Sequence, residues 1–466
     1  MRAMMSPLSH RTFQKIRQIV GKDHCTREKE DLLCYAYDAT ARHFLPDAVV
    51  FPGSRDDISA LMALSYADHF CITPRGAGSG MTGGSLPVQG GVVMVLSRLN
   101  RILEIDCDNL IAHVEPGVVT SRFHQAVEQL GLFYPPDPAS SDFSTLGGNL
   151  AECAGGPRAV KYGVTRDYVL GLEAVLPGGA CIRLGVQTAK GVVGYDVTRL
   201  IVGSEGTLAV ITCMTLRLLP KPATVKTMIA VFAQMESAAT AVAEILRRGI
   251  IPRAIEYMDN ASIRCVDTYL NSGLPISAGA ILILEVDGDI ESVERSAEKL
   301  RKLCQSQGAT AVQVAETEAE RAALWKARKA ISPALYQYGP DKINEDIVVP
   351  KNRIPDMVRK IAQLQSETGL TMASFGHAGD GNIHVNIILD KKNGGDLQKA
   401  ETAVHTLFDY TLELGGTISG EHGVGITKSP YIEKEIGPVE LSLMKAIKTV
   451  FDPKGLLNPG KIFPVS

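Results

Sequence analysis

The segment PRGAGSGMTGG, residues 74–84, decides the fold class of this chain. Its glycines let successive backbone N–H groups approach an anion such as a diphosphate without interference from Cβ atoms. From Gly78 the spacing G-x-G-x-x-G formally matches the dinucleotide fingerprint, but that fingerprint needs a helix directly after the loop. Here Pro87 and Gly90 precede a strand-like run. The segment therefore predicts a phosphate-binding loop outside a Rossmann fold, with a turn-rich surface loop as the alternative.

The residues around this loop predict an α+β domain. Short β-branched runs such as VVMVL (92–96) and TLAVITCMTLRLL (207–219) predict strands that alternate with glycine-rich stretches. One helix is expected from about Arg55 to His69, with Ser54 as its N-cap. LPKPA (219–223) places two prolines close together, which indicates a domain boundary.

The half of the chain after this boundary predicts a second unit. Strands are expected at 225–232, 251–257, 281–286 and 310–315, and helices between them at 237–248 and 290–306, and a long helix at about 317–337 is expected after this set. This order indicates an antiparallel sheet with helices on one face, similar to a ferredoxin-like unit. The expected domains are residues 1–221, residues 222–424 and a C-terminal segment, 425–466.

Length and composition narrow the class of protein. At 466 residues the chain exceeds what one core serves, since single cores stop growing near about 250–300 residues. A net charge of −3 offers no basic excess for a phosphate backbone, so nucleic acid is not an expected partner. Nine scattered cysteines without a CxxC pair favour reduced thiols in a cytoplasmic protein over disulfides or an iron-sulfur site.

The sequence also bears on membrane association. The N-terminal stretch MRAMMSPLSHRTFQKIRQIVG lacks a continuous apolar core and is not expected to be a signal peptide. No stretch approaches the roughly 18 uninterrupted apolar residues that a spanning helix needs. Any link to a membrane is therefore expected to run through a partner subunit.

Two glycine-framed stretches carry candidate metal ligands. SFGHAGDGNIHVN has His377 and His384 on either side of a Gly-Asp-Gly turn, which lets two imidazoles converge. SGEHGVG adds Glu421 and His422. Two histidines and a carboxylate are a ligand set for zinc or another divalent ion, with a position open for substrate. The alternative is that these histidines are only hydrogen-bonded.

A basic helix is a candidate anchor for an anionic substrate. ERAALWKARKAIS places Arg321 and Arg328 seven residues apart, on one helical face. A planar guanidinium suits a carboxylate. The alternative is a solvated basic face, to which Lys326 and Lys329 are assigned.

Further glycine clusters identify a family. STLGGNLAECAGGPRAVKYGVTRDYVLGLE (144–173), LIVGSEGTLAVIT (200–212) and FDPKGLLNPGKIFP (451–464) accompany the loop at 74–84. Together they resemble the FAD-linked oxidases of the vanillyl-alcohol oxidase and p-cresol methylhydroxylase superfamily. The resemblance is nearest to the branch of D-lactate dehydrogenases, glycolate oxidase flavin subunits and D-2-hydroxyglutarate dehydrogenases. It implies an α+β fold with an FAD-binding domain of the p-cresol methylhydroxylase type and a ferredoxin-like cap domain.

The resemblance implies FAD contacts in the first domain and the C-terminal segment. It implies that FAD is bound non-covalently. Some relatives attach FAD covalently through a histidine in the first glycine loop, and residues 74–84 contain no histidine. The implied cofactor-binding residues are Arg75, Gly76, Ala77, Gly78, Ser79, Gly80, Thr82, Pro138, Ser141, Thr145, Gly148, Asn149, Gly155, Gly156, Ile211, Asn458 and Lys461.

The resemblance also implies catalytic roles. The implied ligands of a zinc, iron or manganese ion are His377, His384 and Glu421. His422 matches the catalytic base, Asn386 a substrate contact and Arg328 the anchor of a substrate carboxylate. A cation on the hydroxyl stabilises the developing alkoxide, the imidazole accepts the proton, and the C2 hydride passes to the flavin.

The expected reaction is oxidation of a small D-2-hydroxy acid, D-lactate or glycolate, to the 2-oxo acid. Relatives that act on dicarboxylates place a lysine where this chain has Asn344, which disfavours 2-hydroxyglutarate. The expected electron acceptor is an electron-transferring flavoprotein, an iron-sulfur subunit or a quinone, and a homodimer is an open arrangement. The alternatives are a D-2-hydroxyglutarate dehydrogenase, a metal-independent alcohol oxidase that uses oxygen, and a non-catalytic FAD-binding subunit.

Overall fold

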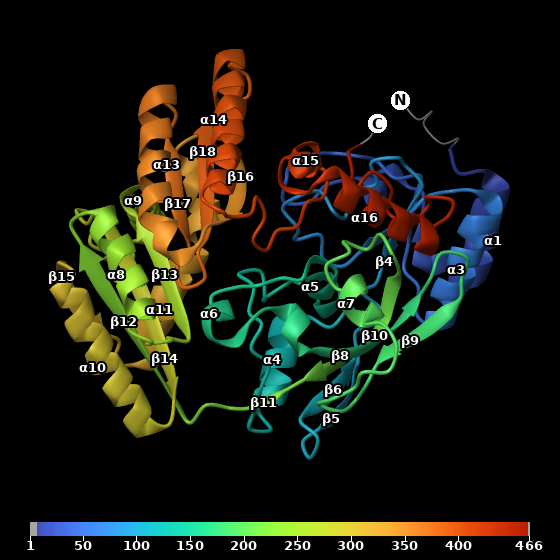
Figure 1. Ribbon diagram of the computed structural model, residues 1–466. Coiled ribbons are helices and arrows are strands. Elements are labelled where there is room, and N and C mark those ends of the chain that lie inside the picture. Colours follow the sequence, from blue (N-terminus) through green and yellow to red (C-terminus); the bar gives the residue numbers. More distant parts are fainter. Residues whose placement is uncertain (1–6, 465–466) are drawn as a thin grey trace. The chain divides into compact units, whose positions relative to one another are not determined.

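The computed structural model describes residues 7–464 and divides the chain into two compact units (Figure 1). The first unit holds the described residues up to Ala154, then Val164–Lys221 and the chain from Glu421 onward. The second unit holds Gly155–Gly163 and Pro222–Gly420. The first six residues, which belong to the stretch not expected to be a signal peptide, lie outside the described residues. No helix within residues 7–464 is both long and apolar enough to cross a bilayer.

The first unit contains a small sheet built around three parallel strands. Its strands, in spatial order, are β1 (Cys25–Thr26), β2 (Ala48–Val50), β4 (Val92–Val95) and β3 (Ile72–Arg75). The last three are parallel, and β1 pairs antiparallel with β2. The C-terminal segment adds to this sheet, since Ile72 N–H donates to Leu456 C=O at 2.9 Å and Asn458 N–H donates to Ile72 C=O at 2.7 Å. Helices α1 (His10–Val20), α2 (Lys29–Cys34) and α3 (Arg55–Asp68) accompany it, and α1 and α3 contribute to one apolar core with its strands.

A second, antiparallel sheet completes the first unit. Its strands, in spatial order, are β5 (Ile102–Asp106), β6 (Ile111–Val114), β10 (Val210–Arg217), β8 (Val169–Val175) and β9 (Cys181–Gly185). The remaining helices of the first unit are α4 (Thr120–Glu128), α5 (Leu146–Glu152), α7 (Val197–Ile201), α15 (Ile432–Glu435) and α16 (Pro438–Phe451). Two short strands of the first unit, β7 (Leu132–Phe133) and β11 (Leu219–Pro220), form a separate two-stranded sheet.

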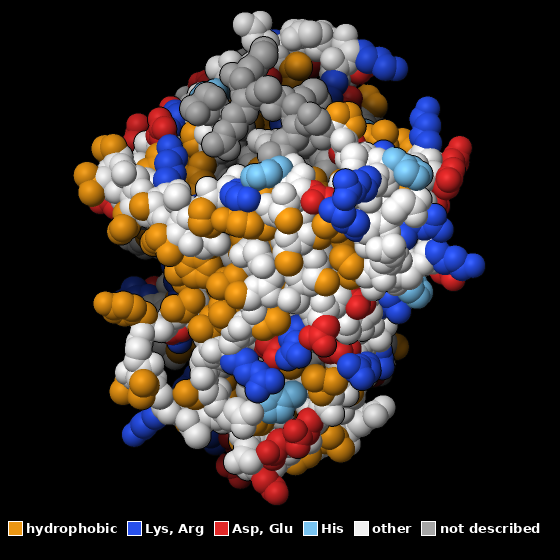
Figure 2. All heavy atoms as spheres, turned by 90° about the vertical axis from the view of Figure 1, so that its right-hand side faces the viewer, with side chains coloured by type: hydrophobic (Ala, Val, Ile, Leu, Met, Phe, Trp, Pro, Cys, Tyr) orange, Lys and Arg blue, Asp and Glu red, His pale blue; other side chains and the backbone are white. Residues whose placement is uncertain are grey.

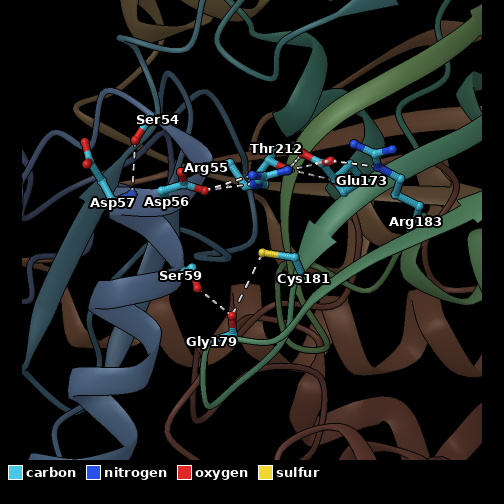
Figure 3. A network of polar contacts seen from close by, with 10 residues as sticks. All are labelled: Ser54, Arg55, Asp56, Asp57, Ser59, Glu173, Gly179, Cys181, Arg183 and Thr212. Atoms are coloured by element: carbon cyan, nitrogen blue, oxygen red, sulfur yellow. Dashed lines mark hydrogen bonds and ion pairs between the residues drawn. The ribbon is translucent and has the colours of Figure 1, made fainter.

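Hydrogen bonds attach α3 to the second sheet (Figure 3). Ser54 Oγ accepts the N–H of Asp57 at 3.1 Å, so the predicted helix and its N-cap are confirmed. Arg55 Nη1 lies 3.4 Å from Glu173 Oε2 on β8. Thr212 Oγ1 donates to Glu173 Oε1 at 3.0 Å. One glutamate therefore joins the helix to two neighbouring strands.

The glycine loop directly follows β3. That strand ends at Arg75, and the next element along the chain is β4, with no helix between them. This confirms that the loop does not belong to a Rossmann fold. Gly78 and Gly83 have φ values of +72° and +84°, in the left-handed region that favours glycine.

The second unit contains one seven-stranded antiparallel sheet. Its strands, in spatial order, are β15 (Ala309–Val314), β12 (Thr224–Phe232), β14 (Ala280–Gly288), β13 (Ala254–Asp259), β17 (Met372–His377), β18 (Asn382–Leu389) and β16 (Asp341–Val348). The four strands predicted between residues 225 and 315 correspond to β12, β13, β14 and β15.

Helices cover both faces of this sheet. On one face, α9 (Asn260–Leu270), α11 (Glu318–Lys329) and α12 (Ile331–Ala334) share an apolar core with Ile283 and Phe375. Leu282 and Leu284 are also fully buried, and side chains alternate between the faces of a strand. Helices α8 (Met235–Arg247) and α10 (Ile290–Ser306) pack against β14 on that opposite face. The remaining helices of the unit are α6 (Ala159–Tyr162), α13 (Ile354–Thr368) and α14 (Gly394–Glu413).

The helix expected at about 317–337 is interrupted. Thr317 caps α11 as its Oγ1 accepts the N–H of Glu320 at 3.2 Å, and α11 ends at Lys329. α12 and a 3-10 turn follow. Pro333 has no N–H to donate to the Lys329 carbonyl, which explains why one helix does not continue through this point.

The face drawn in Figure 2 mixes basic, acidic and hydrophobic side chains. Exposed apolar side chains occur in the first unit on α16, where Val439, Leu443 and Val450 are 76%, 63% and 79% exposed. Single exposed apolar residues are normal on a protein surface, whereas α16 carries several of them.

Candidate functional site

A cavity in the first unit lies beside the glycine loop. Its wall also includes part of α5, part of β10 and the pair Glu421 and His422. The expected cofactor-binding residues that line it are Arg75, Gly76, Ala77, Gly78, Ser79, Gly80, Pro138, Thr145, Gly148, Asn149 and Ile211. A glycine-rich loop on one wall suits the phosphate groups of a nucleotide cofactor, because the backbone N–H groups of the glycines are not screened by side chains.

The guanidinium of Arg75 packs beneath the glycine loop. Its Nη2 donates to Tyr37 C=O at 2.8 Å, and its centre lies 5.8 Å from the centroid of the Tyr35 ring. A Cβ atom at Gly78 would collide with this guanidinium. Burial is the largest influence on Arg75 and lowers its pKa. The arginine therefore fixes the loop from behind, and glycine is required above it.

Six expected cofactor contacts do not line the cavity, namely Thr82, Ser141, Gly155, Gly156, Asn458 and Lys461. Gly155 and Gly156 belong to the second unit. Thr82 instead fixes the backbone of a cavity residue, since its Oγ1 donates to His422 C=O at 3.0 Å. Ser141 N–H donates to Pro138 C=O at 2.8 Å and so supports a residue of the wall. Their roles in binding a cofactor remain predictions.

The C-terminal residues Asn458 and Lys461 bind the backbone next to the glycine loop. Asn458 Nδ2 donates to Gly84 C=O at 2.9 Å and to Glu205 C=O at 2.7 Å. Lys461 Nζ donates to Leu86 C=O at 2.6 Å. Burial lowers the pKa of Lys461 to about 8, with Glu205 acting in the opposite direction. These residues shape the loop through its carbonyls.

His377 and His384 meet on a hairpin of the second unit. His377 ends β17, His384 is near the start of β18, and the predicted turn lies between the two strands. The centroids of the imidazoles are 5.2 Å apart and their planes are at 87°. Gly381 in the turn has φ +92°, and a Cβ there would collide with Val349 C=O. The hairpin thus brings the two rings together and needs a glycine to do so.

Each imidazole has a buried carboxylate at its Nδ1 atom. Glu256 Oε1 lies 2.7 Å from His377 Nδ1, and Asp346 Oδ1 lies 3.5 Å from His384 Nδ1. Each carboxylate is directly opposite its histidine on the adjacent strand. A carboxylate hydrogen-bonded to Nδ1, as at His377, fixes the orientation of an imidazole and leaves Nε2 as the nitrogen that can bind a metal. The pair therefore fits the donor set of a divalent cation.

The segment that leads to Glu421 is bound to Asp346. The N–H of Gly420 donates to Asp346 Oδ2 at 2.9 Å, and Asn382 Nδ2 donates to Asp346 Oδ1 at 2.6 Å. A Cβ at Gly420 would collide with the Asn382 amide. Asp346 therefore lies beside His384 and also holds the chain one residue before Glu421.

Arg328 and Asn386 lie among the same buried polar side chains of the second unit. Arg328 Nε and Nη2 lie 2.8 Å and 2.7 Å from Glu256 Oε2, and the guanidinium is 4.8 Å from the Phe375 ring centroid. It is only 6% exposed, so the alternative of a solvated basic position is wrong for this arginine. Asn386 Oδ1 accepts Asn344 Nδ2 at 2.8 Å across β18 and β16.

Comparison with known proteins decides the family. Sequence models match the chain over residues 46–185 for an FAD binding domain and over residues 221–462 for the C-terminal domain of FAD linked oxidases. Glycolate oxidase subunit GlcD of Bacillus subtilis is 44% identical over 451 residues, which cover 97% of this chain and 96% of that protein. The chain belongs to the FAD-linked oxidases.

Further relatives agree with this assignment of an FAD-linked oxidoreductase. GlcD of Escherichia coli strain K12 is 38% identical over 93% of this FAD-linked oxidase and 87% of its own length. D-lactate dehydrogenase of Anaerostipes hadrus is 35% identical, with coverages of 90% and 89%. The family expected from the sequence is therefore confirmed.

Two solved structures confirm the expected fold class. p-Cresol methylhydroxylase superimposes with a TM-score of 0.82 at 17% identity, over 98% of both chains. 4-Ethylphenol oxidase from Gulosibacter chungangensis gives 0.78 at 18% identity, also over 98% of both chains. At such low identity the likeness concerns the fold alone.

Sequence reasoning missed the carboxylates that support the candidate residues of this FAD-linked oxidase. Glu256 and Asp346 stand on strands far from the histidines in sequence, and Glu152 and Glu205 lie in the wall of the glycine-loop cavity. One signal was available for Glu256, a charged residue in the mostly apolar strand β13, whereas β16 is itself rich in polar residues and gave no such signal for Asp346. Buried charges are kept only where they are paired, so such positions indicate a polar partner.

Proposed function

We propose that this FAD-linked oxidase oxidises a small 2-hydroxy acid, glycolate or D-lactate, to the 2-oxo acid. The observation that carries the proposal is the pair of imidazoles at His377 and His384, each with a buried carboxylate at Nδ1. The names of the relatives, glycolate oxidase subunit and D-lactate dehydrogenase, support the substrate class.

We assign a divalent cation, zinc, iron or manganese, to His377, His384 and Glu421. When bound, FAD would supply the hydride acceptor and the cation would supply a Lewis acid at the substrate hydroxyl. Chain connectivity supports Glu421, because it follows Gly420, whose N–H is bound to the carboxylate beside His384. Consecutive Cα atoms are about 3.8 Å apart, so this hydrogen bond limits where Glu421 can lie.

We assign the proton-accepting step to His422. His422 lines the cavity beside the glycine loop, and Thr82 Oγ1 donates to its backbone carbonyl. An imidazole can accept a proton from a hydroxyl near neutral pH when it is held within hydrogen-bond reach. This hydrogen bond helps to position the loop that carries His422.

We assign recognition of the substrate to Arg328 and Asn386. Glu256 binds both Arg328 and His377, so a carboxylate anchor and a metal ligand share one buried support. Asn344, in turn, orients the amide of Asn386. Such shared supports fix the distance between the two ends of a 2-hydroxy acid, which is how an active site aligns a C–H bond with its acceptor.

We assign re-oxidation of the flavin to a protein or quinone acceptor. The Bacillus subtilis relative is named as a subunit, which supports an oxidase complex. An iron-sulfur subunit, an electron-transferring flavoprotein or a quinone each fits this role, and a homodimer of the chain is compatible with it.

The proposal is tested by an anaerobic screen of D- and L-2-hydroxy acids with the FAD-loaded chain. We expect glycolate or D-lactate to bleach the visible flavin band, and expect a chelator to suppress bleaching until a divalent metal is restored. Bleaching by aryl alcohols that survives chelation would contradict the proposal in favour of a metal-independent oxidase. Bleaching by D-2-hydroxyglutarate alone would identify the substrate as a dicarboxylate. If no acid bleaches the flavin, the chain would be a non-catalytic FAD-binding subunit.

Replacing His422 by alanine tests the proposed base. We expect FAD content and metal content to stay within about twofold of the wild type while flavin reduction falls by about 10²–10⁴-fold, the usual contribution of general-base catalysis. The matched control is His405→Ala, because His405 is an exposed histidine on α14. Near-normal reduction in His422→Ala would reject the role, and loss of reduction in the control would show that the effect is not specific.

A further inference from the structure

The loop behind His422 is held by the carboxylate of Glu205. Glu205 Oε1 accepts the N–H of Val424 at 2.7 Å, and Oε2 accepts the N–H of Gly425 at 2.7 Å. Both oxygens of one side chain are therefore used by two consecutive N–H groups. Consecutive N–H groups of this kind favour a negatively charged oxygen between them.

The backbone at Glu205 is strained in a way that serves this contact. Its φ is +53°, in the left-handed region, and it lies between Gly203 and Gly206, which are left-handed as well. Non-glycine residues remain in this region only where surrounding contacts fix them, often at functional sites. Asn458 provides such a contact, since its Nδ2 donates to Glu205 C=O at 2.7 Å. The chain thus sustains an unfavourable conformation to aim this carboxylate at the loop.

A second carboxyl group, that of Glu152 at the end of α5, reaches the same point. An ideal Cβ atom at Gly423 would collide with Glu152 Oε2 and lie 3.0 Å from Glu205 Oε1. An ideal Cβ at Gly84 would lie 2.8 Å from Glu152 Oε1. The two carboxyl groups therefore meet against the Cα of Gly423, in space that only glycines leave open.

The surroundings of the two carboxyl groups differ. Glu205 has its two N–H donors and the nearby ammonium groups of Lys461 and Lys428. Glu152 Oε2 is buried and has no hydrogen-bond partner among the described residues, and the charged groups that face it are Glu205 and Asp38. Two adjacent buried carboxyl groups do not both ionise, because like charges at contact distance repel strongly. The charge belongs on Glu205 and the proton on Glu152.

The pKa shifts of the two carboxyl groups agree with this geometry. Burial raises the pKa of Glu152 well above its ordinary value, and the charges of Glu205 and Asp38 raise it further. Burial also raises the pKa of Glu205, but the N–H groups of Val424 and Gly425 oppose this.

We propose that Glu152 and Glu205 form a carboxyl pair with a single proton, held by Glu152, in the wall of the flavin cavity. Glu152 gives the cavity a neutral hydrogen-bond donor, and the ionised Glu205 acts as a positioning residue for the loop that carries Glu421 and His422. The first part needs only a bound flavin. The second part rests on the function proposed above for His422.

The charge assignment is tested by anaerobic redox titration of the FAD-loaded chain against a reference dye at pH 7. The variants are Glu152→Gln, the double variant Glu152→Gln/Glu205→Gln, and the control Glu173→Gln, which removes a charge of β8 outside this cavity. We expect the ratio of reduced to oxidised flavin at a fixed dye potential to stay within twofold of the wild type in Glu152→Gln and in the control. We expect it to rise at least about fivefold in the double variant, because removing a nearby negative charge favours the reduced flavin.

A rise in Glu152→Gln as large as in the double variant would overturn the assignment, because it would mean that Glu152 carries the charge. An unchanged ratio in the double variant would overturn it as well. If the double variant loses FAD, the comparison of Glu152→Gln with the wild type still decides. The titration uses no substrate and no metal, so its result stands whether or not a 2-hydroxy acid bleaches the flavin.

The positioning role is tested by the rate of flavin reduction. We expect the double variant to be at least about tenfold slower than Glu152→Gln with a KM within twofold, since small displacements of a catalytic group have effects of this size. Equal rates in the two variants would overturn the positioning role and leave the charge assignment intact.

Discussion

Replacing Glu256 by glutamine is expected to destabilise the second unit by about 3–5 kcal/mol, the cost of removing one partner of a buried ion pair. The Glu256 side chain is fully buried and accepts from Arg328 Nε at 2.8 Å and Nη2 at 2.7 Å while facing His377 Nδ1 at 2.7 Å. A glutamine has one acceptor oxygen in place of two, so one of these donors would face an NH₂ group. Arg328 would then be a buried charge without its counter-charge.

A double-mutant cycle with Arg328→Met isolates the interaction energy between Glu256 and Arg328. Glu256→Gln and Arg328→Met each leave one charge unpaired, whereas the double variant removes both, so the cycle should report a coupling of at least about 1.5 kcal/mol. The measurement is urea unfolding of the FAD-loaded chain, followed by far-ultraviolet circular dichroism. The matched control is Glu244→Gln on α8, because Glu244 also binds two arginines, Arg247 and Arg248, but these are largely exposed. Additive effects of the two buried substitutions, or an equal loss in the control, would refute the reasoning.

The remaining predictions concern the first unit. Ser54→Ala is expected to lower the free energy of unfolding by about 1 kcal/mol, because Ser54 Oγ caps α3, and a loss below about 0.3 kcal/mol in urea unfolding would contradict this role. Raising the pH from 6 to 9 is expected to lower the thermal midpoint of the wild type more than that of Glu152→Gln. Burial raises the pKa of Glu152, so its contribution is fully present below the unfolded value and is lost as the pH rises through the folded value. Parallel pH profiles of the two proteins in calorimetry would count against a protonated Glu152.

Local patterns allowed part of the site to be predicted. The glycine loop, the cap at Ser54 and the turn between His377 and His384 are all determined by residues close together in sequence. The strand positions of the second unit followed from β-branched runs for the same reason.

The carboxylates that support the candidate site residues could not be predicted in the same way. Glu256 reaches His377 only because β13 pairs with β17, and this pairing is a property of the whole sheet. The contact of Glu205 with Val424 and Gly425 likewise joins residues that are 219 and 220 positions apart in the sequence. The break between α11 and α12, in contrast, has a local cause, since Pro333 is visible in the sequence.

The division of the chain into units also sets the order in which a ribosome can deliver them. Every segment of the second unit has been synthesised once Gly420 is reached, whereas the first unit still lacks the residues from Glu421 onward. Among those late residues are Leu456 and Asn458, which bond to β3, the strand that leads into the glycine loop. The first unit is therefore completed after the second, and a nascent chain carries an unfinished cofactor-binding unit until Leu456 and Asn458 emerge.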